Sequence, residues 1–177
     1  HMPLASDKVR HVGDGVAVVI ANDIYSAYDA LEKIAVDYGV LPAVVDAKKA
    51  TEADAPQVHD EIANNTSFHW PLGERDAIDA AMATADHIVE LELINQRLVP
   101  NAMEPRACVA QWNEFSDEMT VWTTSQNPHI IRLLLSMATM GLPENKIRVI
   151  SPDVGGGFGS KIFHYAEEVI VPWASMK

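Results

Sequence analysis

The glycine-rich stretch at residues 153–161 constrains this chain more than any other feature. Four of the five residues from Gly155 to Gly159 are glycine, and only Phe158 interrupts them. An apolar run enters the stretch and a periodic apolar segment leaves it, so the pattern predicts a loop between a strand and a helix. Glycine permits positive φ and a close approach of backbone to ligand, and amides before a helix bind anions. The stretch is a candidate binding loop; the alternative is a tight turn without a ligand.

Two common nucleotide-binding motifs do not fit this loop. A P-loop requires Gly-Lys followed by Ser or Thr, whereas here Ser160 precedes Lys161 and Ile162 follows it. In the dinucleotide fingerprint, Gly155 and Gly157 fit the first two glycine positions, but Ser160 stands at the third. Nucleotide binding by this loop therefore remains a further hypothesis, which titration with a nucleotide would test.

Composition excludes several other classes of function. A length of 177 residues allows one domain or two small ones, and a hydrophobic content of 48% is typical of a globular chain. The net charge of −12 argues against nucleic acid and anionic membranes as partners. No apolar run reaches about 18 residues, so we expect no membrane span. A single cysteine excludes an intrachain disulfide and favours a reducing compartment, which predicts a cytoplasmic protein.

The first part of the chain predicts two strands and a helix. Apolar runs at 8–12 and 16–20 flank an Asp-Gly pair at 14–15, which is a strong hairpin signal. Asn22 or Asp23 is placed to cap the following helix. The apolar face of that helix recurs at helical spacing, at Ala27, Ala30, Leu31 and Ile34.

A strand and a long connection follow. Apolar and polar residues alternate over 36–45, which predicts a strand that Pro42 confines to a sheet edge. The pattern then dissolves over 48–73, and loops this long usually have a function or join domains. His59 and His69 lie in this stretch, but their spacing fits no metal template, so solvated histidines are favoured over a metal site.

The second half begins with a helix and three strands. Helical spacing predicts the helix at 77–85, and alternation predicts strands at 87–97, 107–112 and 119–124. Cys108 lies within one of these strands without an obvious basic neighbour, so we expect a buried, unreactive thiol.

The clearest helix begins after these strands. The Asn-Pro pair at 127–128 supplies its cap and first residue, and Gly141 supplies its C-terminal cap. A strand at 146–151 then leads into the glycine loop. The segment 162–173 continues at helical spacing, and Pro172 should kink or end that helix.

Four motifs follow one another along the second half of the chain: Asn95-Gln96-Arg97, Met103-Glu104-Pro105-Arg106, Thr124-Ser125-Gln126-Asn127-Pro128-His129 and Asp153-Val154-Gly155-Gly156-Gly157-Phe158-Gly159-Ser160-Lys161. In this order and at this spacing they resemble the large subunit of molybdenum hydroxylases, which include xanthine dehydrogenase, aldehyde oxidase and aerobic carbon monoxide dehydrogenase. The likeness is greatest to the carbon monoxide dehydrogenase type. Residues 9–45 are also similar to the α/β hammerhead domain that precedes the cofactor domain there.

This resemblance implies an α+β fold. We expect a partial hammerhead-type α/β unit at 1–50, a linker at 51–73, and the first part of a mixed α+β molybdopterin-binding domain at 74–177, cut at its C-terminus. The family subunit is several times longer than this chain, so the isolated chain is expected to be an incomplete and inactive piece of an oxidoreductase.

The resemblance also implies a set of site residues. Gln126 matches the family glutamine that lies beside the metal and donates a hydrogen bond to an oxo ligand, a role that suits an uncharged carboxamide. Phe158 and Gly159 match residues packed against the metal centre and its dithiolene. Gly156 and Gly157 match positions where backbone approaches the cofactor closely. Taken alone, Gln126 would be read as a surface loop amide.

The implied cofactor is molybdenum held by molybdopterin, often as its cytosine dinucleotide. The implied reaction is oxidation of carbon monoxide, an aldehyde or an N-heterocycle with water as the oxygen source. Electrons would pass to iron–sulfur clusters on a small subunit and to FAD on a medium subunit. The family's general-base glutamate matches no residue here; Glu167 and Glu168 are expected to be solvated. The alternative is a non-catalytic α+β domain without cofactor that acts only through a partner chain.

Overall fold

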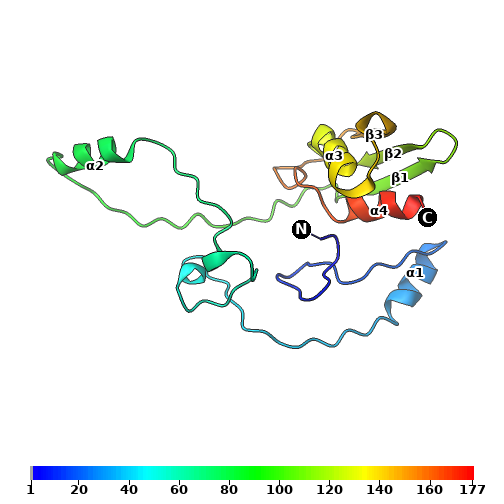
Figure 1. The fold of residues 1–177 in the computed structure, drawn as a ribbon, viewed down its shortest axis with the longest axis horizontal. Coiled ribbons are helices and arrows are strands. Elements are labelled where there is room, and N and C mark those ends of the chain that lie inside the picture. The colour runs from blue at the N-terminus through cyan, green and yellow to red at the C-terminus, as the bar shows by residue number, and fades with distance from the viewer. Residues whose placement is uncertain (1) are drawn as a thin grey trace. The chain divides into compact units, whose positions relative to one another are not determined.

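The structure, a computed structural model, describes residues 2–177. The chain divides into two compact units, one comprising the residues up to Ala35 together with Leu98–Lys177, and the other comprising Val36–Arg97. Figure 1 shows the helices and strands of both units. The first unit contains a small mixed sheet with helices, which confirms the predicted α+β class. The division into domains at 50 and 73 stays a prediction.

The sheet has the strand order β1-β2-β3. β1 (Cys108–Asn113) and β2 (Glu118–Thr123) are antiparallel, and β2 runs parallel to β3 (Ile147–Ile150). All three strands were predicted within one residue of these bounds. β2 is therefore the central strand, and its last residue lies directly before the Thr-Ser-Gln-Asn segment.

Two helices pack against this sheet. α3 (Pro128–Leu134) contacts β3 and continues as a π-helical segment (Leu135–Met140) that ends at Gly141, whose φ is 66°. Proline at the first turn and glycine at the end confirm the predicted helix. α4 (Glu167–Ser175) packs against β1, where Trp112 N donates to Ser175 Oγ at 2.9 Å.

α4 differs from the predicted helix at 162–173 in two ways. It begins at Glu167, so residues 162–166 remain outside it, and Pro172 lies inside it rather than at its end. Helical spacing predicts which residues of the segment share an apolar face, but it does not show at which residue the helix begins. The missing amide of Pro172 removes one hydrogen bond only a turn before the helix ends at Ser175.

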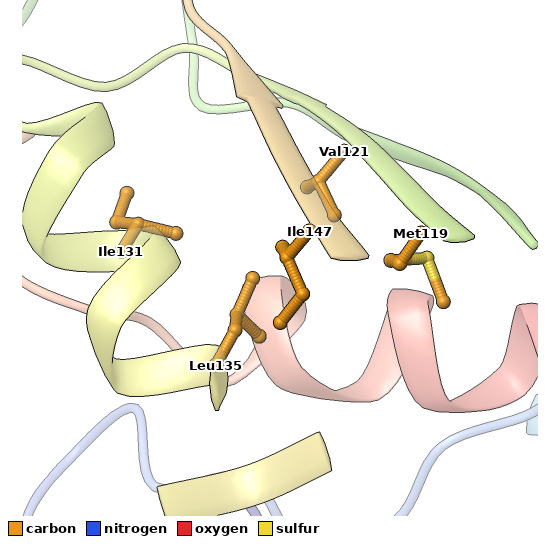
Figure 2. Packing of buried hydrophobic residues seen from close by; sticks show 5 residues of the cluster. All are labelled: Met119, Val121, Ile131, Leu135 and Ile147. Carbon is orange, nitrogen blue, oxygen red and sulfur yellow. The ribbon is translucent and has the colours of Figure 1, made fainter. Parts of the chain in front are cut away.

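The core lies between β2, β3 and the helical segment after β2. Figure 2 shows its five buried apolar side chains, which are Met119, Val121, Ile131, Leu135 and Ile147. Full burial of such a side chain contributes about 1.5–3 kcal/mol. These contacts pack β2, the helical segment after it and the strand that leads into the glycine loop against one another.

The remaining helices are short and lie outside this core. α1 (Ile24–Leu31) begins after Asp23, whose side chain accepts from Ser26 N, as the cap prediction expected. α2 (Arg75–Ala83) confirms the helix predicted at 77–85. The 3-10 turns are Lys49–Thr51, Ala63–Asn65 and Glu144–Lys146.

The hairpin predicted around Asp14 is wrong. Residues 8–20 contain no strand. Asp14 Oδ2 instead accepts from the backbone amides of Arg10 at 2.6 Å and His11 at 3.2 Å. A short acidic side chain that bonds nearby amides in this way competes with the ladder bonds that a hairpin would make.

The strands predicted at 36–45 and 87–97 are also wrong. Both stretches lack strand pairing, and every residue from 87 to 97 is exposed. Alternation of apolar and polar residues identifies a face but supplies no partner, and an unpaired strand leaves its amides and carbonyls unbonded.

As for membranes, the helices seen in residues 2–177 are all too short or too polar to cross one.

Candidate functional site

The segment 125–127 leaves β2 and lies against the end of the glycine loop. Gln126 N donates to the carbonyl oxygen of Lys161 at 2.9 Å, and the buried Ser125 hydroxyl donates to the same oxygen at 3.3 Å. Ser125 Oγ also accepts from Asn127 N at 2.9 Å. Asn127 thus stands at the predicted N-cap position, but its side chain forms no cap hydrogen bond.

The Gln126 carboxamide is oriented by the loop. Its Oε1 accepts from Gly159 N at 3.1 Å and from Lys161 N at 3.3 Å. Because two amides share the oxygen, the Nε2 end of the side chain is turned away from them. The residue is exposed, and no acceptor among residues 2–177 takes up its Nε2 protons. The site therefore presents an uncharged, oriented donor.

The glycines allow this close approach. A Cβ on Gly157 would lie 2.3 Å from Gln126 Oε1, so a side chain there would displace the Gln126 carboxamide. Gly156 has φ 96° and Gly159 has φ 86°, a region in which glycine has no steric penalty. Phe158 also has a positive φ, 51°, and its ring is 75% exposed. The structure thus places Gln126 in contact with the loop that contains the other four predicted site residues.

The loop also fits an anionic or flat polar group. Gly157 N and Phe158 N, two successive amides, donate to no acceptor in the part of the chain that the structure describes. Successive free amides in a loop with left-handed residues bind anions. A Cβ at Gly159 would meet no atom within 4 Å, so this face of the loop is open.

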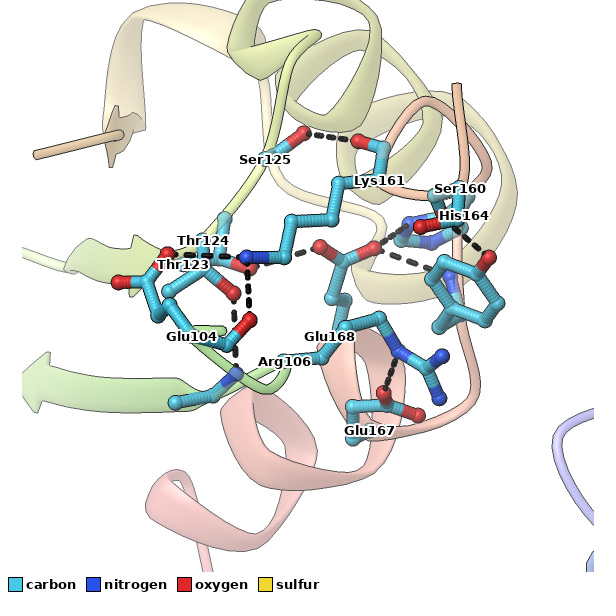
Figure 3. A network of polar contacts seen from close by, with 12 residues as sticks. Glu104, Arg106, Thr123, Thr124, Ser125, Ser160, Lys161, His164, Glu167 and Glu168 are labelled. Atoms are coloured by element: carbon cyan, nitrogen blue, oxygen red, sulfur yellow. Dashed lines mark hydrogen bonds and ion pairs between the residues drawn. The ribbon is translucent and has the colours of Figure 1, made fainter. Parts of the chain in front are cut away.

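An ion pair that the sequence analysis did not identify ties the loop to the Met-Glu-Pro-Arg segment (Figure 3). Lys161 Nζ donates to Glu104 Oε2 at 2.9 Å and to the Glu104 carbonyl at 2.8 Å, and Gly155 N donates to Glu104 Oε2 at 2.7 Å. The hydrogen bond from Lys161, followed by that from Gly155, lowers the pKa of Glu104. The only sequence signal for Glu104 is its place in the Met-Glu-Pro-Arg motif.

A second contact joins the same segment to the residues after the loop. Arg106 Nε donates to Glu167 Oε1 at 2.7 Å, and its guanidinium lies 3.7 Å from the centre of the Tyr165 ring. The Tyr165 hydroxyl donates to the carbonyl of Ser160. Glu104 therefore contacts both ends of the loop, and Arg106 contacts Tyr165, which bonds to the loop at Ser160.

Glu168 was expected to be solvated, and that expectation is wrong. The residue is 4% exposed, and its carboxylate accepts from Thr123 Oγ1 at 2.7 Å, from Tyr165 N at 3.0 Å and from His164 Nδ1 at 3.3 Å. Burial raises the pKa of Glu168, but these hydrogen bonds outweigh it, so its pKa lies below the ordinary value of 4.5. Burial raises the pKa of neighbouring Cys108 to about 12, which supports an unreactive thiol.

We expect Glu168 to make the stability of this unit sensitive to acid. A carboxyl whose pKa is lowered in the folded state stabilises that state above its unfolded pKa, and this contribution is lost as pH falls through the folded pKa. Thermal unfolding of wild type and of a Glu168→Gln variant, followed from about pH 7 to about pH 3, should show a difference that shrinks in acid. The exposed Glu114 supplies the control, since Glu114→Gln should follow wild type at every pH. A difference that stays constant would contradict this account.

The histidines of the long connection show no metal cluster. His59 lies 3.5 Å from Glu61, and residues 2–177 contain no group of three or more His, Cys, Asp or Glu side chains able to hold a metal ion.

Comparison with known proteins gives matches along almost the whole chain. Residues 58–177 match the family described as molybdopterin cofactor-binding domain, and residues 1–42 match the aldehyde oxidase and xanthine dehydrogenase a/b hammerhead domain. The carbon monoxide dehydrogenase large chain of Afipia carboxidovorans is 39% identical over 98% of this chain and 23% of its own length. The nicotine 6-hydroxylase large subunit of Paenarthrobacter nicotinovorans is 34% identical over 98% of this chain and 21% of its own length.

A solved structure agrees with these matches. The crystal structure of Cu,Mo-CO dehydrogenase in its carbon monoxide reduced state matches with a TM-score of 0.89 and 38% identity, over 98% of this chain and 23% of that one. The chain thus spans less than a quarter of the length of these relatives.

Proposed function

Because this chain belongs to the molybdopterin cofactor-binding domain family, we propose that it supplies part of the molybdenum site of a molybdenum hydroxylase. In this proposal Gln126, Gly156, Gly157, Phe158 and Gly159 contact the cofactor. Homology to molybdopterin-binding large subunits covers both the hammerhead region and the loop region.

The observation that carries this proposal is the orientation of the Gln126 carboxamide. Two loop amides occupy its oxygen, so its amino group is the end left to donate to a ligand. An uncharged donor of this kind would hold an oxygen of the bound cofactor without adding charge to the site. Attachment to the start of α3 and to the Lys161 peptide restricts where this donor points.

The glycine loop provides the other contacts. Gly157 N and Phe158 N are free to donate to oxygens of the cofactor, and Gly156 and Gly159 allow the backbone to come close. The exposed ring of Phe158 would pack against the bound group and exclude water from one side. The chemistry supplied by bound molybdopterin and its metal is the oxidation of a small substrate with oxygen from water.

The finer assignments follow from the family and remain part of the proposal. The cofactor is the molybdopterin cytosine dinucleotide, and the remainder of the large subunit completes its site. Electrons pass to an iron–sulfur small subunit and an FAD medium subunit in the cytoplasm. The names of the relatives include both carbon monoxide and nicotine enzymes, so the substrate class stays open among carbon monoxide, aldehydes and N-heterocycles.

The test uses the intact large subunit containing this chain, purified from a host that makes the cofactor. We expect molybdenum and pterin in near-equal amount to protein, measured by elemental mass spectrometry and by pterin fluorescence. Gln126→Glu keeps the accepting oxygen and removes the donor, so turnover with an artificial electron acceptor should fall at least about hundredfold. Gln111→Glu, an exposed change on β1, is the matched control.

Two results would contradict the proposal. Wild type without molybdenum or pterin would favour the non-catalytic alternative, in which the chain acts only through a partner. Wild-type turnover by Gln126→Glu would remove Gln126 from the site.

A further inference from the structure

We propose that Lys161 and Glu104 are a positioning pair that sets the direction of the Gln126 carboxamide. This inference rests on the proposed function, because the direction of the carboxamide matters only where its amino group donates to the cofactor. Neither residue belongs to the proposed contact set; both act through the glycine loop and through Gln126.

Lys161 links Glu104 to Gln126 through three of its groups. Its amide donates to Gln126 Oε1 at 3.3 Å, and its carbonyl accepts from Gln126 N at 2.9 Å. Its ammonium extends to the other side and donates to two oxygens of Glu104. A shift of Lys161 therefore moves both the backbone and the side-chain contacts of Gln126.

Glu104 closes the loop at one oxygen. Its Oε2 accepts from Gly155 N, at the start of the loop, and from Lys161 Nζ, at the end. The three residues with positive φ, Gly156, Phe158 and Gly159, lie between these two points. A non-glycine residue in the left-handed region persists only where its surroundings hold it, and Glu104 supplies that constraint for Phe158.

The burial of Lys161 also favours a role in positioning. The Lys161 side chain is 2% exposed, and that of Glu104 is 32% exposed. Taking an ammonium out of water is costly, and apolar residues of similar volume often replace buried ion pairs without loss of stability. A methionine could fill the space of Lys161, but it would not hold Gly155 and Lys161 to a common oxygen.

The experiment measures amide hydrogen exchange in the intact large subunit, resolved to Gly159 and Lys161. Glu104→Gln and Lys161→Met should each raise exchange at these two amides about tenfold, because the hydrogen bonds to Gln126 Oε1 open more often. Amides of β1 and β2 should exchange at the wild-type rate. Glu144→Gln is the matched control, since it removes a carboxylate from the ion pair with Arg132, away from the loop.

If the ion pair only stabilised the fold, its loss would raise exchange in the sheet as much as in the loop. That result overturns the inference, and so does unchanged exchange at Gly159 and Lys161. Either single change leaves one charge without its partner, so folding could fail. The double variant Glu104→Gln with Lys161→Met removes both charges and should fold, and it should still show faster loop exchange. If its loop exchanges as wild type does, the inference is overturned.

The two proposals fail in different ways. Exchange in the loop needs no bound cofactor, so a wild type without molybdenum would defeat the proposed function while loop exchange still decides whether the pair holds Gln126. If the wild type contains molybdenum but loop exchange is unchanged in both variants, the positioning role alone is overturned.

Discussion

A Gly157→Ala variant is expected to lose turnover by a factor of about 10²–10³, the effect of removing one donor aimed at a developing charge. The added Cβ would lie 2.3 Å from Oε1, 2.4 Å from Cδ and 2.8 Å from Cγ of Gln126. The carboxamide must therefore swing away and give up its bonds to Gly159 N and Lys161 N. Thermal unfolding should change little, because Gln126 is exposed and its displaced side chain enters water.

The variant is measured in the intact large subunit by turnover with an artificial acceptor and by molybdenum content per protein. Gly157 does not have a positive φ, so alanine there adds volume without backbone strain. Gly39→Ala is the control, since its Cβ would meet nothing within 4 Å. Wild-type turnover by Gly157→Ala, with the metal in place, would show that the position of the carboxamide does not matter.

A Met119→Ala variant is expected to lower the free energy of unfolding by about 2–5 kcal/mol, the usual range for a buried methionine replaced by alanine. Met119 is fully buried at the centre of the sheet, where its neighbours in the core are Val121, Ile131, Leu135 and Ile147 (Figure 2). Removal of its side chain leaves a cavity that these residues fill only in part. Urea unfolding followed by Trp fluorescence gives the difference.

Met137→Ala is the matched control for this prediction. Met137 is 77% exposed in the π-helical segment, so the same substitution should stay within about 0.5 kcal/mol of wild type. Equal effects of the two substitutions would mean that the core does not lie where β2 and the helices meet.

The elements that sequence patterns predicted correctly are those with local signals. The Asn-Pro pair and Gly141 bracket one helix, and Asp23 caps another. β1 and β2 lie next to each other in sequence, so each supplies the other with a partner. The segments 36–45 and 87–97 carry the same alternation as β1 and β2, but within the described chain they pair with no other strand and form none themselves.

In the site, too, only the residues with local signals were predicted. The glycine loop and Gln126 belong to recognisable sequence motifs, and the structure brings them into contact. Glu104 and Lys161 are 57 positions apart, and Thr123 and Glu168 are 45 apart. Neither periodicity nor capping relates residues at such separations, so the burial of Lys161 and Glu168 could not be predicted from the sequence.

The position of the core within the chain has a consequence for biosynthesis. None of residues 2–118 is buried, and every buried residue lies between Met119 and Pro172. A ribosome adds about 5–20 residues per second. The first part of the chain therefore leaves the exit tunnel several seconds before the strands and helices that form the core, with its apolar side chains still open to chaperones. The loop proposed to hold the cofactor, at residues 153–161, is translated after this first part, so cofactor insertion must follow synthesis of the loop.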